Sequence, residues 1–292
     1  MEGAHRFRGP GRAAVRALAA SAACGVALAV LPGAPARAAP RGDEDCRPST
    51  PRSDRLAGLG PRGELVLASG ARAVLSGLRW PEDAAAAEAA ADRLRGFSGR
   101  PLIVTARGPE DRWGRVRADI LAEADDAAGG EPEDLAGGLV AAGLAQADAG
   151  EADALCRPGL LALEAAPRAA GLGVWREPVR EARTLTAAAG LADRFVVAEG
   201  RVLHVGERRS RTYIDLAARG EGGLSVTVTK RTWRIMLARG LTAASLTGRR
   251  VRVRGTVEVW RAPVLDIAAA DLIEVLQGRI VQGHVVGEPQ RR

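Results

Sequence analysis

The segment RRVRVRGTVEVW, residues 249–260, alternates apolar and polar side chains over the length of a strand. Its apolar positions are Val251, Val253, Val257 and Val259, and the polar positions between them are Arg252, Arg254, Thr256 and Glu258. Successive side chains of a β-strand point to opposite faces, so this segment can pack only one face on a core. It therefore requires a sheet, and it predicts that the face carrying the arginines is exposed.

Short segments of a similar kind surround it. Residues 194–220 predict two strands about a turn at 206–210, residues 223–230 predict a third, and residues 262–276 predict one or two more. Between them, residues 231–240 predict a short helix. Five or so short strands with one helix in the middle are typical of a small Greek-key barrel of the OB type. We therefore expect an OB-like β-barrel over residues 193–276, followed by a tail at 277–292.

The preceding half mixes strands with helices. The predicted strands are residues 64–78, in two pieces about a Ser69–Gly70 turn, residues 100–108 and residues 113–124. The predicted helices are residues 81–97, residues 131–147 and residues 151–175, the last of them broken or kinked by Pro158 and Pro167. The expected fold class is mainly β with helices (α+β). We expect a first domain at 61–176, an irregular arm at 39–60 before it, and a linker at 177–192.

The first 38 residues have the pattern of a secretory signal peptide. Arg6, Arg8, Arg12 and Arg16 precede an apolar run of small residues, and Ala36-Arg37-Ala38 is a cleavage pattern. Lipidation at Cys24 is the alternative to cleavage after Ala38, although Ser21 stands where an aliphatic residue is usual. No later segment is long and apolar enough to cross a bilayer. The chain is therefore expected to be exported, periplasmic or secreted, without an integral membrane segment.

Charge is distributed unevenly along the remaining chain. Residues 39–189 hold 19 basic and 24 acidic side chains, whereas residues 190–292 hold 18 basic and 10 acidic ones, a net charge of +8. A partner with a phosphate backbone would therefore prefer the second half.

Two cysteines remain after cleavage, Cys46 and Cys156. In an oxidising compartment such a pair predicts one disulfide; the alternative is two unpaired thiols. His204 and His284 are the histidines that remain, so no metal cluster of His and Cys can be assembled.

Several pieces of the first half occur in a characteristic order. GLRWPE contains Gly77, Pro81 and Glu82, and DRWGR contains Asp111, Gly114 and Arg115; two helices and GLGVW follow. This ordered set, over about residues 60 to 176, resembles the thermonuclease (staphylococcal nuclease-like) family. The resemblance implies a five-stranded OB barrel with three helices that hydrolyses DNA and RNA phosphodiesters with calcium. Residues 193–276 look like the OB-type domain often found after such nuclease domains in exported bacterial proteins.

The resemblance also implies roles for particular residues. Glu82 stands at the position of the general base, and Arg115 at that of the phosphate-binding arginine of the turn. Val74 replaces the second phosphate-binding arginine, while Arg79 and Gly63 replace the two metal-binding aspartates, with Glu64 beside Gly63. Trp113 replaces the usual Tyr. The catalytic positions are therefore expected to be vestigial, with no metal bound and no cofactor.

Two arrangements would preserve activity. Arg79 could act with Arg115 as an electrophile in place of the cation, or Glu64 and Asp83 could hold a shifted calcium ion. The structural interpretation is that Glu82 interacts with a helix dipole and that Arg115 pairs with Asp111 or Asp119. The main hypothesis is a non-catalytic module that binds nucleic acid or acts as a scaffold. The alternatives are an active exported endonuclease and an envelope module that binds protein or glycan.

Arginines also cluster in the second half. Arg208, Arg209 and Arg211 crowd one turn, and Arg252 and Arg254 share the polar face of residues 249–260. With Tyr213, Trp233 and Trp260 as stacking platforms, they are candidates to bind a single strand of nucleic acid through residues 193–276. The alternative is a solvated barrel face with core aromatics. The identity of a protein partner stays open.

Overall fold

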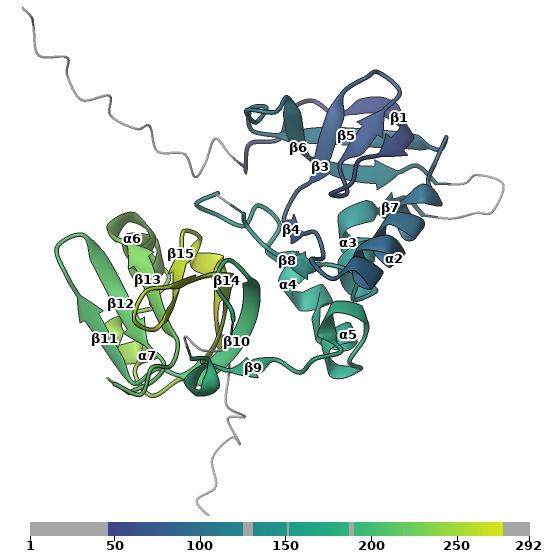
Figure 1. Cartoon of the computed structure of the whole chain (residues 1–292). Coiled ribbons are helices and arrows are strands. Elements are labelled where there is room, and N and C mark those ends of the chain that lie inside the picture. The colour runs from purple at the N-terminus through teal and green to yellow at the C-terminus, as the bar shows by residue number, and fades with distance from the viewer. Residues whose placement is uncertain (1–45, 125–130, 151, 187–189, 219, 277–292) are drawn as a thin grey trace, which may run out of the picture. The chain divides into compact units, whose positions relative to one another are not determined.

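The chain is mixed α+β and mostly β-strand, with one closed five-stranded barrel and a second sheet that curls into a half-barrel (Figure 1). The structure is a computed structural model that describes residues 46–124, 131–150, 152–186, 190–218 and 220–276. The predicted signal peptide, with Cys24 and the cleavage site, and the predicted tail lie outside these residues. In the part described, no helix is both long and apolar enough to span a membrane.

The first barrel closes because its third and fifth strands pair with each other. Its strands are β1 (Arg52–Leu59), β2 (Leu65–Leu67), β3 (Arg72–Leu75), β5 (Pro101–Arg107) and β6 (Arg115–Ala122). Antiparallel pairs join β3 to β2, β2 to β1, β1 to β5 and β5 to β6, and the parallel pair of β3 with β6 completes the ring. Leu65, Leu102 and Ile120 are buried inside it.

The helices occur in the order that the sequence predicts, but the predicted helix at 131–147 is helical only over Leu135–Ala141, with a short strand at each end. The helices are α2 (Ala84–Arg95), α3 (Leu135–Ala141), α4 (Gly159–Leu163), α5 (Ala165–Ala169) and the 3-10 helix η1 (Gly173–Trp175). The short strands are β4 (Leu78–Arg79), β7 (Glu133–Asp134) and β8 (Gln146–Ala147). Helix α2 begins after Asp83, whose carboxylate accepts a hydrogen bond from Ala86 N at 2.9 Å. Such a cap satisfies a backbone N–H that the first helical turn leaves unpaired.

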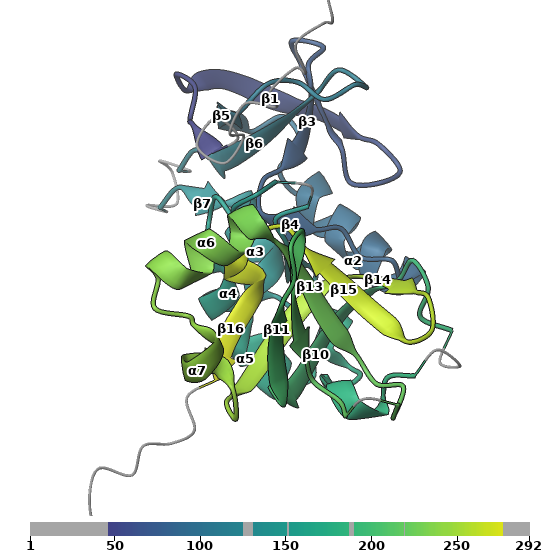
Figure 2. The same cartoon turned by 90° about the vertical axis from the view of Figure 1, so that its left-hand side faces the viewer.

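The second sheet has an interrupted first long strand, and the two pieces of that strand, Phe195–Arg201 and His204–Glu207, lie at or next to opposite ends of the strand order. Its elements are β9 (Arg180–Glu181), η2 (Ala182–Thr184), β10 (Phe195–Arg201), β11 (His204–Glu207), β12 (Arg211–Asp215), β13 (Ser225–Thr229), α6 (Lys230–Ala238), α7 (Ala243–Leu246), β14 (Arg250–Val259), β15 (Pro263–Ile267), η4 (Ala270–Leu272) and β16 (Ile273–Leu276). Strand β10 pairs with β14, whereas β11 pairs with β12. Val226, Val251 and Trp233 fill its core, and α6 packs on β13 (Figure 2).

The two sheets share one connectivity. If β10 and β11 count as one first strand, each sheet runs first, second, third, fifth, fourth and back to first, with a parallel pair between third and fifth. In each, a helix (α2 or α6) follows the third strand. This arrangement is consistent with OB-like Greek-key barrels.

Two predicted boundaries are wrong. Residues 39–60 are not all an irregular arm, because Arg52–Leu59 is the first strand of the closed barrel. Residues 177–192 are not only a linker, since β9 pairs with β10 and Ala182, Leu185 and Leu191 pack in the second core. The alternation in β1 is obscured by Arg, Asp and Ser residues, because much of this strand is exposed.

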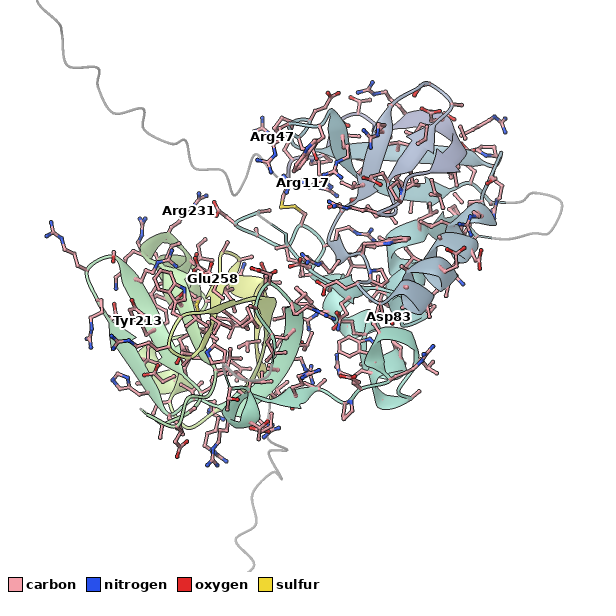
Figure 3. The ribbon with its side chains drawn as sticks, in the orientation of Figure 1. Arg47, Asp83, Arg117, Tyr213, Arg231 and Glu258 are labelled. Carbon is pink, nitrogen blue, oxygen red and sulfur yellow. A yellow bond between two sulfur atoms is a disulfide. The ribbon has the colours of Figure 1, made fainter. Side chains whose placement is uncertain are left out.

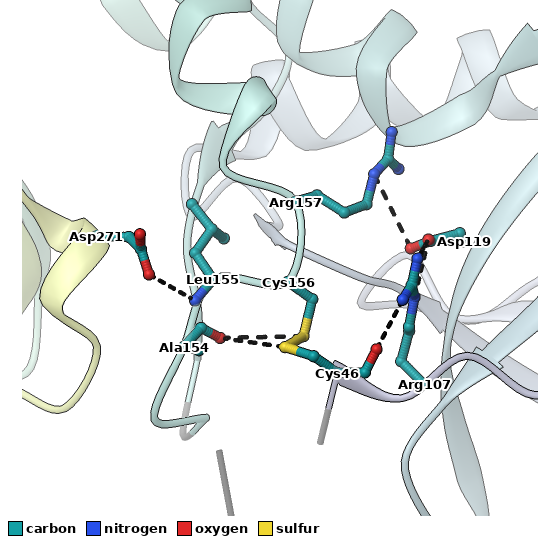
Figure 4. The surroundings of a disulfide bond; sticks show 8 residues. All are labelled: Cys46, Arg107, Asp119, Ala154, Leu155, Cys156, Arg157 and Asp271. Carbon is teal, nitrogen blue, oxygen red and sulfur yellow. Dashed lines mark hydrogen bonds and ion pairs between the residues drawn. A yellow bond between two sulfur atoms is a disulfide. The ribbon is translucent and has the colours of Figure 1, made fainter. Parts of the chain in front are cut away.

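Cys46 and Cys156 form a disulfide, as the sequence predicts, with their Cα atoms 5.1 Å apart (Figure 4). It ties the stretch before β1 to the loop before α4. Arg107 reinforces the same place, because its Nη1 donates to Cys46 O at 2.7 Å while its Nε donates to Asp119 at 2.9 Å.

Candidate nucleic-acid interface and the pocket of the first barrel

A pocket of about 510 Å³ lies on the first barrel, where β3, β4 and the start of β6 meet. It is lined by Arg62, Gly63, Val74, Leu75, Leu78, Arg79, Trp80, Pro81, Glu82 and Arg115. The structure thus brings together the five positions to which the family resemblance gives a role, although they are spread over more than fifty residues of sequence.

Arg115 is held by a turn that the sequence around it builds. Gly114 takes the left-handed φ of 68°, which favours glycine, and Asp111 accepts hydrogen bonds from Trp113 N at 2.9 Å and Arg115 N at 3.0 Å. The guanidinium donates from Nε to Asp111 at 2.8 Å and from Nη1 to Glu64 at 3.1 Å, and it stacks on the ring of Trp113. Arg115 therefore already binds two carboxylates, and a phosphate would have to compete with them.

Glu64 is the buried partner of this arginine. Burial alone would raise the pKa of Glu64, but hydrogen bonds from its own N–H and that of Arg62, together with the Arg115 guanidinium, lower it. Arg72 adds a second cation at 3.8 Å. Glu64 is therefore an ionised carboxylate neutralised by arginines, which leaves little charge to attract a metal ion.

Gly63 could not be replaced by the aspartate that the family carries without a rearrangement. Its φ is 72°, and a Cβ built there would lie 2.2 Å from Cε3 of Trp80. The indole of Trp80, from the GLRWPE segment, occupies the space that a metal-binding side chain would need. Val74 and Arg79 also line the pocket without offering a carboxylate.

Glu82 is engaged from both sides. One oxygen accepts from Arg79 Nη2 at 2.9 Å and from Phe195 N at 3.3 Å, and the other lies 2.9 Å from Arg194 Nε. Arg79 also stacks over the Phe195 ring at 5.3 Å. Because Phe195 begins β10 of the second sheet and Arg194 directly precedes it, Glu82 joins the first barrel to that sheet. Neither oxygen is left without a donor, so Glu82 is poorly placed to take a proton from water.

The donor groups at this pocket do not fit calcium. Calcium takes six to eight oxygen ligands, several of them carboxylates. Among the residues that the structure describes, no three His, Cys, Asp or Glu side chains converge to hold a metal ion. Glu64 and Asp83 do not form the shifted metal site considered above, because Glu64 pairs with Arg115 and Asp83 caps α2.

The second sheet presents a different surface. Tyr213 lies on β12 (Figure 3) and is 40% exposed. Trp260, in the turn between β14 and β15, is 80% exposed. Trp233, by contrast, is a core residue of α6. The β11–β12 turn with Arg208 and Arg209 lies at one end of β12, and the β14–β15 turn with Trp260 and Arg261 lies nearer the other. Tyr213 lies between these turns.

Among the described residues of the second half, several basic side chains are neutralised by carboxylates of the protein. Arg211 pairs with Asp266, Lys230 with Glu207 at 3.2 Å, and Arg250 with Glu181 at 2.9 Å. In the described ranges, Arg208, Arg209 and Arg261 are exposed and no ion pair with a carboxylate is found for them. The predicted cluster is therefore smaller than its sequence suggests, because Arg211 is part of an ion pair and only Arg208 and Arg209 remain available.

The prediction for Arg252 and Arg254 is wrong. Arg254 is 0% exposed and donates to Glu164 at 2.7 Å and to Glu274 at 2.6 Å; Arg252 donates to Glu199 at 2.6 Å. Burial alone would lower the pKa of Arg254, but the carboxylates of Glu164 and Glu274 raise it. The alternating pattern placed both residues on the polar face correctly. It could not indicate that the segment around Glu164 covers this face.

Sequence reasoning missed three further polar residues on the second sheet. His204, Asp215 and Ser225 are cross-strand neighbours on β11, β12 and β13. Asp215 Oδ2 lies 3.2 Å from His204 Nδ1, and Asp215 Oδ1 accepts from Ser225 Oγ at 3.2 Å. No local motif marks them, because only the strand pairing brings them together.

Comparison with known proteins adds no assignment to this geometry. No protein-family model matches the sequence, and no curated protein matches it either.

Proposed function

We propose that this chain is an exported, thermonuclease-like protein that binds single-stranded nucleic acid through its second sheet and does not hydrolyse it. The observation that carries the proposal is the pair of exposed aromatics, Tyr213 and Trp260, beside Arg208, Arg209 and Arg261. Exposed rings give stacking platforms to bases, and unpaired arginines attract the phosphate backbone. OB barrels bind oligonucleotides through the face of their second and third strands and the loops beside it.

The pocket of the first barrel supports the proposed lack of hydrolysis. Phosphodiester hydrolysis needs a cation at the phosphoryl oxygen and a carboxylate that activates water. Arg79 lines this pocket, and the oxygens of Glu82 are taken by Arg79, Arg194 and Phe195 N. The Cys46–Cys156 disulfide supports the proposed export, because disulfides persist mainly in oxidising compartments.

An active endonuclease with a rearranged site is the second candidate. The observation in its favour is that Arg62, Arg79 and Arg115 line one pocket with Glu82. In that case the arginines would stabilise the transition state without a metal. Metal-independent cleavage that is lost in Arg115→Ala would support it.

Trp260→Ala tests the binding proposal. Stacking contributes about 1–3 kcal/mol per base, so this variant should bind a labelled single strand about 5- to 150-fold more weakly, as measured by fluorescence anisotropy. Trp113→Ala is the matched control, because Trp113 is also an exposed tryptophan, at 56%, but lies on the first barrel. An equal loss in both variants, or no loss in Trp260→Ala, would contradict the proposal.

A further inference from the structure

A pocket of about 360 Å³ opens on the outer face of the second sheet beside Tyr213. Most of its described lining residues are Gly or Ala, which contribute little besides space. The lining side chains that can recognise a ligand are His204, Arg208, Tyr213, Asp215 and Ser225. A pocket of this size with a few converging polar groups is typical of a small-ligand site.

Gly206 keeps the space beside Tyr213 open. It is the cross-strand partner of Tyr213, and a Cβ built on it would lie 2.9 Å from Cε1 of His204. A side chain at position 206 would therefore displace the imidazole or cover the aromatic ring. Without one, a flat base can stack against Tyr213 over the backbone of β11.

Asp215 lies two residues farther along the same face of β12. Its neighbours hold the carboxylate in place, with His204 Nδ1 at Oδ2 and Ser225 Oγ at Oδ1, both at 3.2 Å. An ionised carboxylate has about four acceptor positions. Its two neighbours use one on each oxygen, so each oxygen keeps acceptor capacity toward the pocket.

We propose that this pocket selects guanine from the bound strand, through paired hydrogen bonds to Asp215 and stacking on Tyr213. This inference rests on the proposed function. Guanine is the base whose Watson–Crick edge presents two adjacent donors, N1–H and N2–H, and a carboxylate offers two adjacent acceptors. Adenine and cytosine each place a ring acceptor where guanine has N1–H, so that acceptor would face an Asp215 oxygen.

Arg208 supplies the complementary charge. It lines the same pocket, is exposed, and its Nη1 makes one long contact, 3.4 Å, with the backbone carbonyl of Glu207. A nucleotide whose base lies on Tyr213 would place its phosphate toward this arginine. The pocket thus contains an acceptor for the base, a ring for stacking and a cation for the phosphate.

The test compares strands of about twelve nucleotides, within the site size of one OB fold. They are thymidine strands in which isolated thymines are replaced by guanine, hypoxanthine or adenine, so that guanine quadruplexes cannot form. The mature chain should bind the guanine strand about tenfold more tightly than the hypoxanthine strand, because hypoxanthine lacks the second donor to the charged group.

The variant Asp215→Asn provides the sharper test of whether Asp215 selects the base. An amide offers one donor and one acceptor, the pair that suits adenine, so this variant should bind the adenine strand more tightly than the guanine strand. Asp266→Asn is the control, because Asp266 is a carboxylate of the same sheet that does not line the pocket; it should keep the wild-type order. If wild type and Asp215→Asn bind all strands alike, the guanine inference is overturned while the proposed function stands. If wild type binds no strand at all, both are overturned.

Discussion

Many of the charged residues that the structure describes are paired with residues of opposite charge, and the most deeply buried pair is Arg254 with Glu164. Arg254 and Glu164 are each 0% exposed and lie 2.7 Å apart. Taking two charges out of water costs several kcal/mol each, and close pairing offsets that cost only while both partners are present. Such a pair joins β14 to the junction of α4 and α5, and it provides no free charge for a ligand.

Arg254→Met should therefore destabilise the protein strongly. Without Arg254, Glu164 stays buried with Arg168 at 3.3 Å and the N–H of Ala147 at 2.6 Å as its partners. A broken buried pair typically costs about 3–5 kcal/mol. Urea unfolding followed by circular dichroism measures the loss. Arg261→Met, at an exposed arginine, should change the unfolding free energy by no more than about 0.5 kcal/mol. Similar stabilities for the two variants would show that the buried pair is not needed.

The buried carboxyl of Asp148 should make the folding stability of the protein depend on pH. Burial raises the pKa of Asp148 above its ordinary value of 3.8, although Gly150 N–H and the charges of Arg79 and Arg254 act in the opposite direction. A raised folded pKa means that this group favours folding below its unfolded pKa, and that the contribution is lost as pH rises through the folded pKa. Asp148→Asn should thus raise Tm at neutral pH and leave it nearly unchanged near pH 3. A lower Tm at neutral pH would contradict this.

At the scale of elements, local patterns predicted most strands and helices. Asp83 and Gly96 bound α2, and the Ser69–Gly70 turn joins β2 to β3, because these signals depend on neighbours in sequence. The role of Arg254 and the row of His204, Asp215 and Ser225 could not be predicted in this way. Those contacts depend on which strands pair and on what covers the sheet, and neither is encoded within a few residues. The family resemblance remains a proposal, although its five positions share one pocket.

The turn between β1 and β2 shows how a single turn can close off the pocket of the first barrel. Gly63 and Gly70 both have a left-handed φ, 72° and 86°, but a Cβ at Gly63 would meet Trp80 whereas one at Gly70 would meet open space. Gly63→Ala should therefore cost more than Gly70→Ala, by about 1–3 kcal/mol, as expected for overpacking. Chemical denaturation of the two variants measures the difference. Equal costs would mean that Trp80 moves away freely, and that a carboxylate could be accommodated at position 63.

At the scale of the whole molecule, the two sheets share one strand connectivity but differ in the side chains that they leave exposed. The described residues belong to one compact unit. In it, the pocket of the first barrel is occupied by internal ion pairs and by contacts to Arg194 and Phe195. The second sheet leaves Tyr213, Trp260 and a few arginines exposed. From this contrast we propose that the chain binds a single strand through the second sheet without cleaving it.

The most direct test incubates residues 39–292 with a labelled single strand of DNA or RNA, with calcium or with a chelator. Anisotropy across a salt series and gel analysis of the same samples are then compared. We expect binding that weakens as salt rises, because phosphate contacts release counterions, that does not depend on calcium, and that leaves the strand intact. Calcium-dependent cleavage that is lost in Arg115→Ala, or the absence of binding at low salt, would contradict the account.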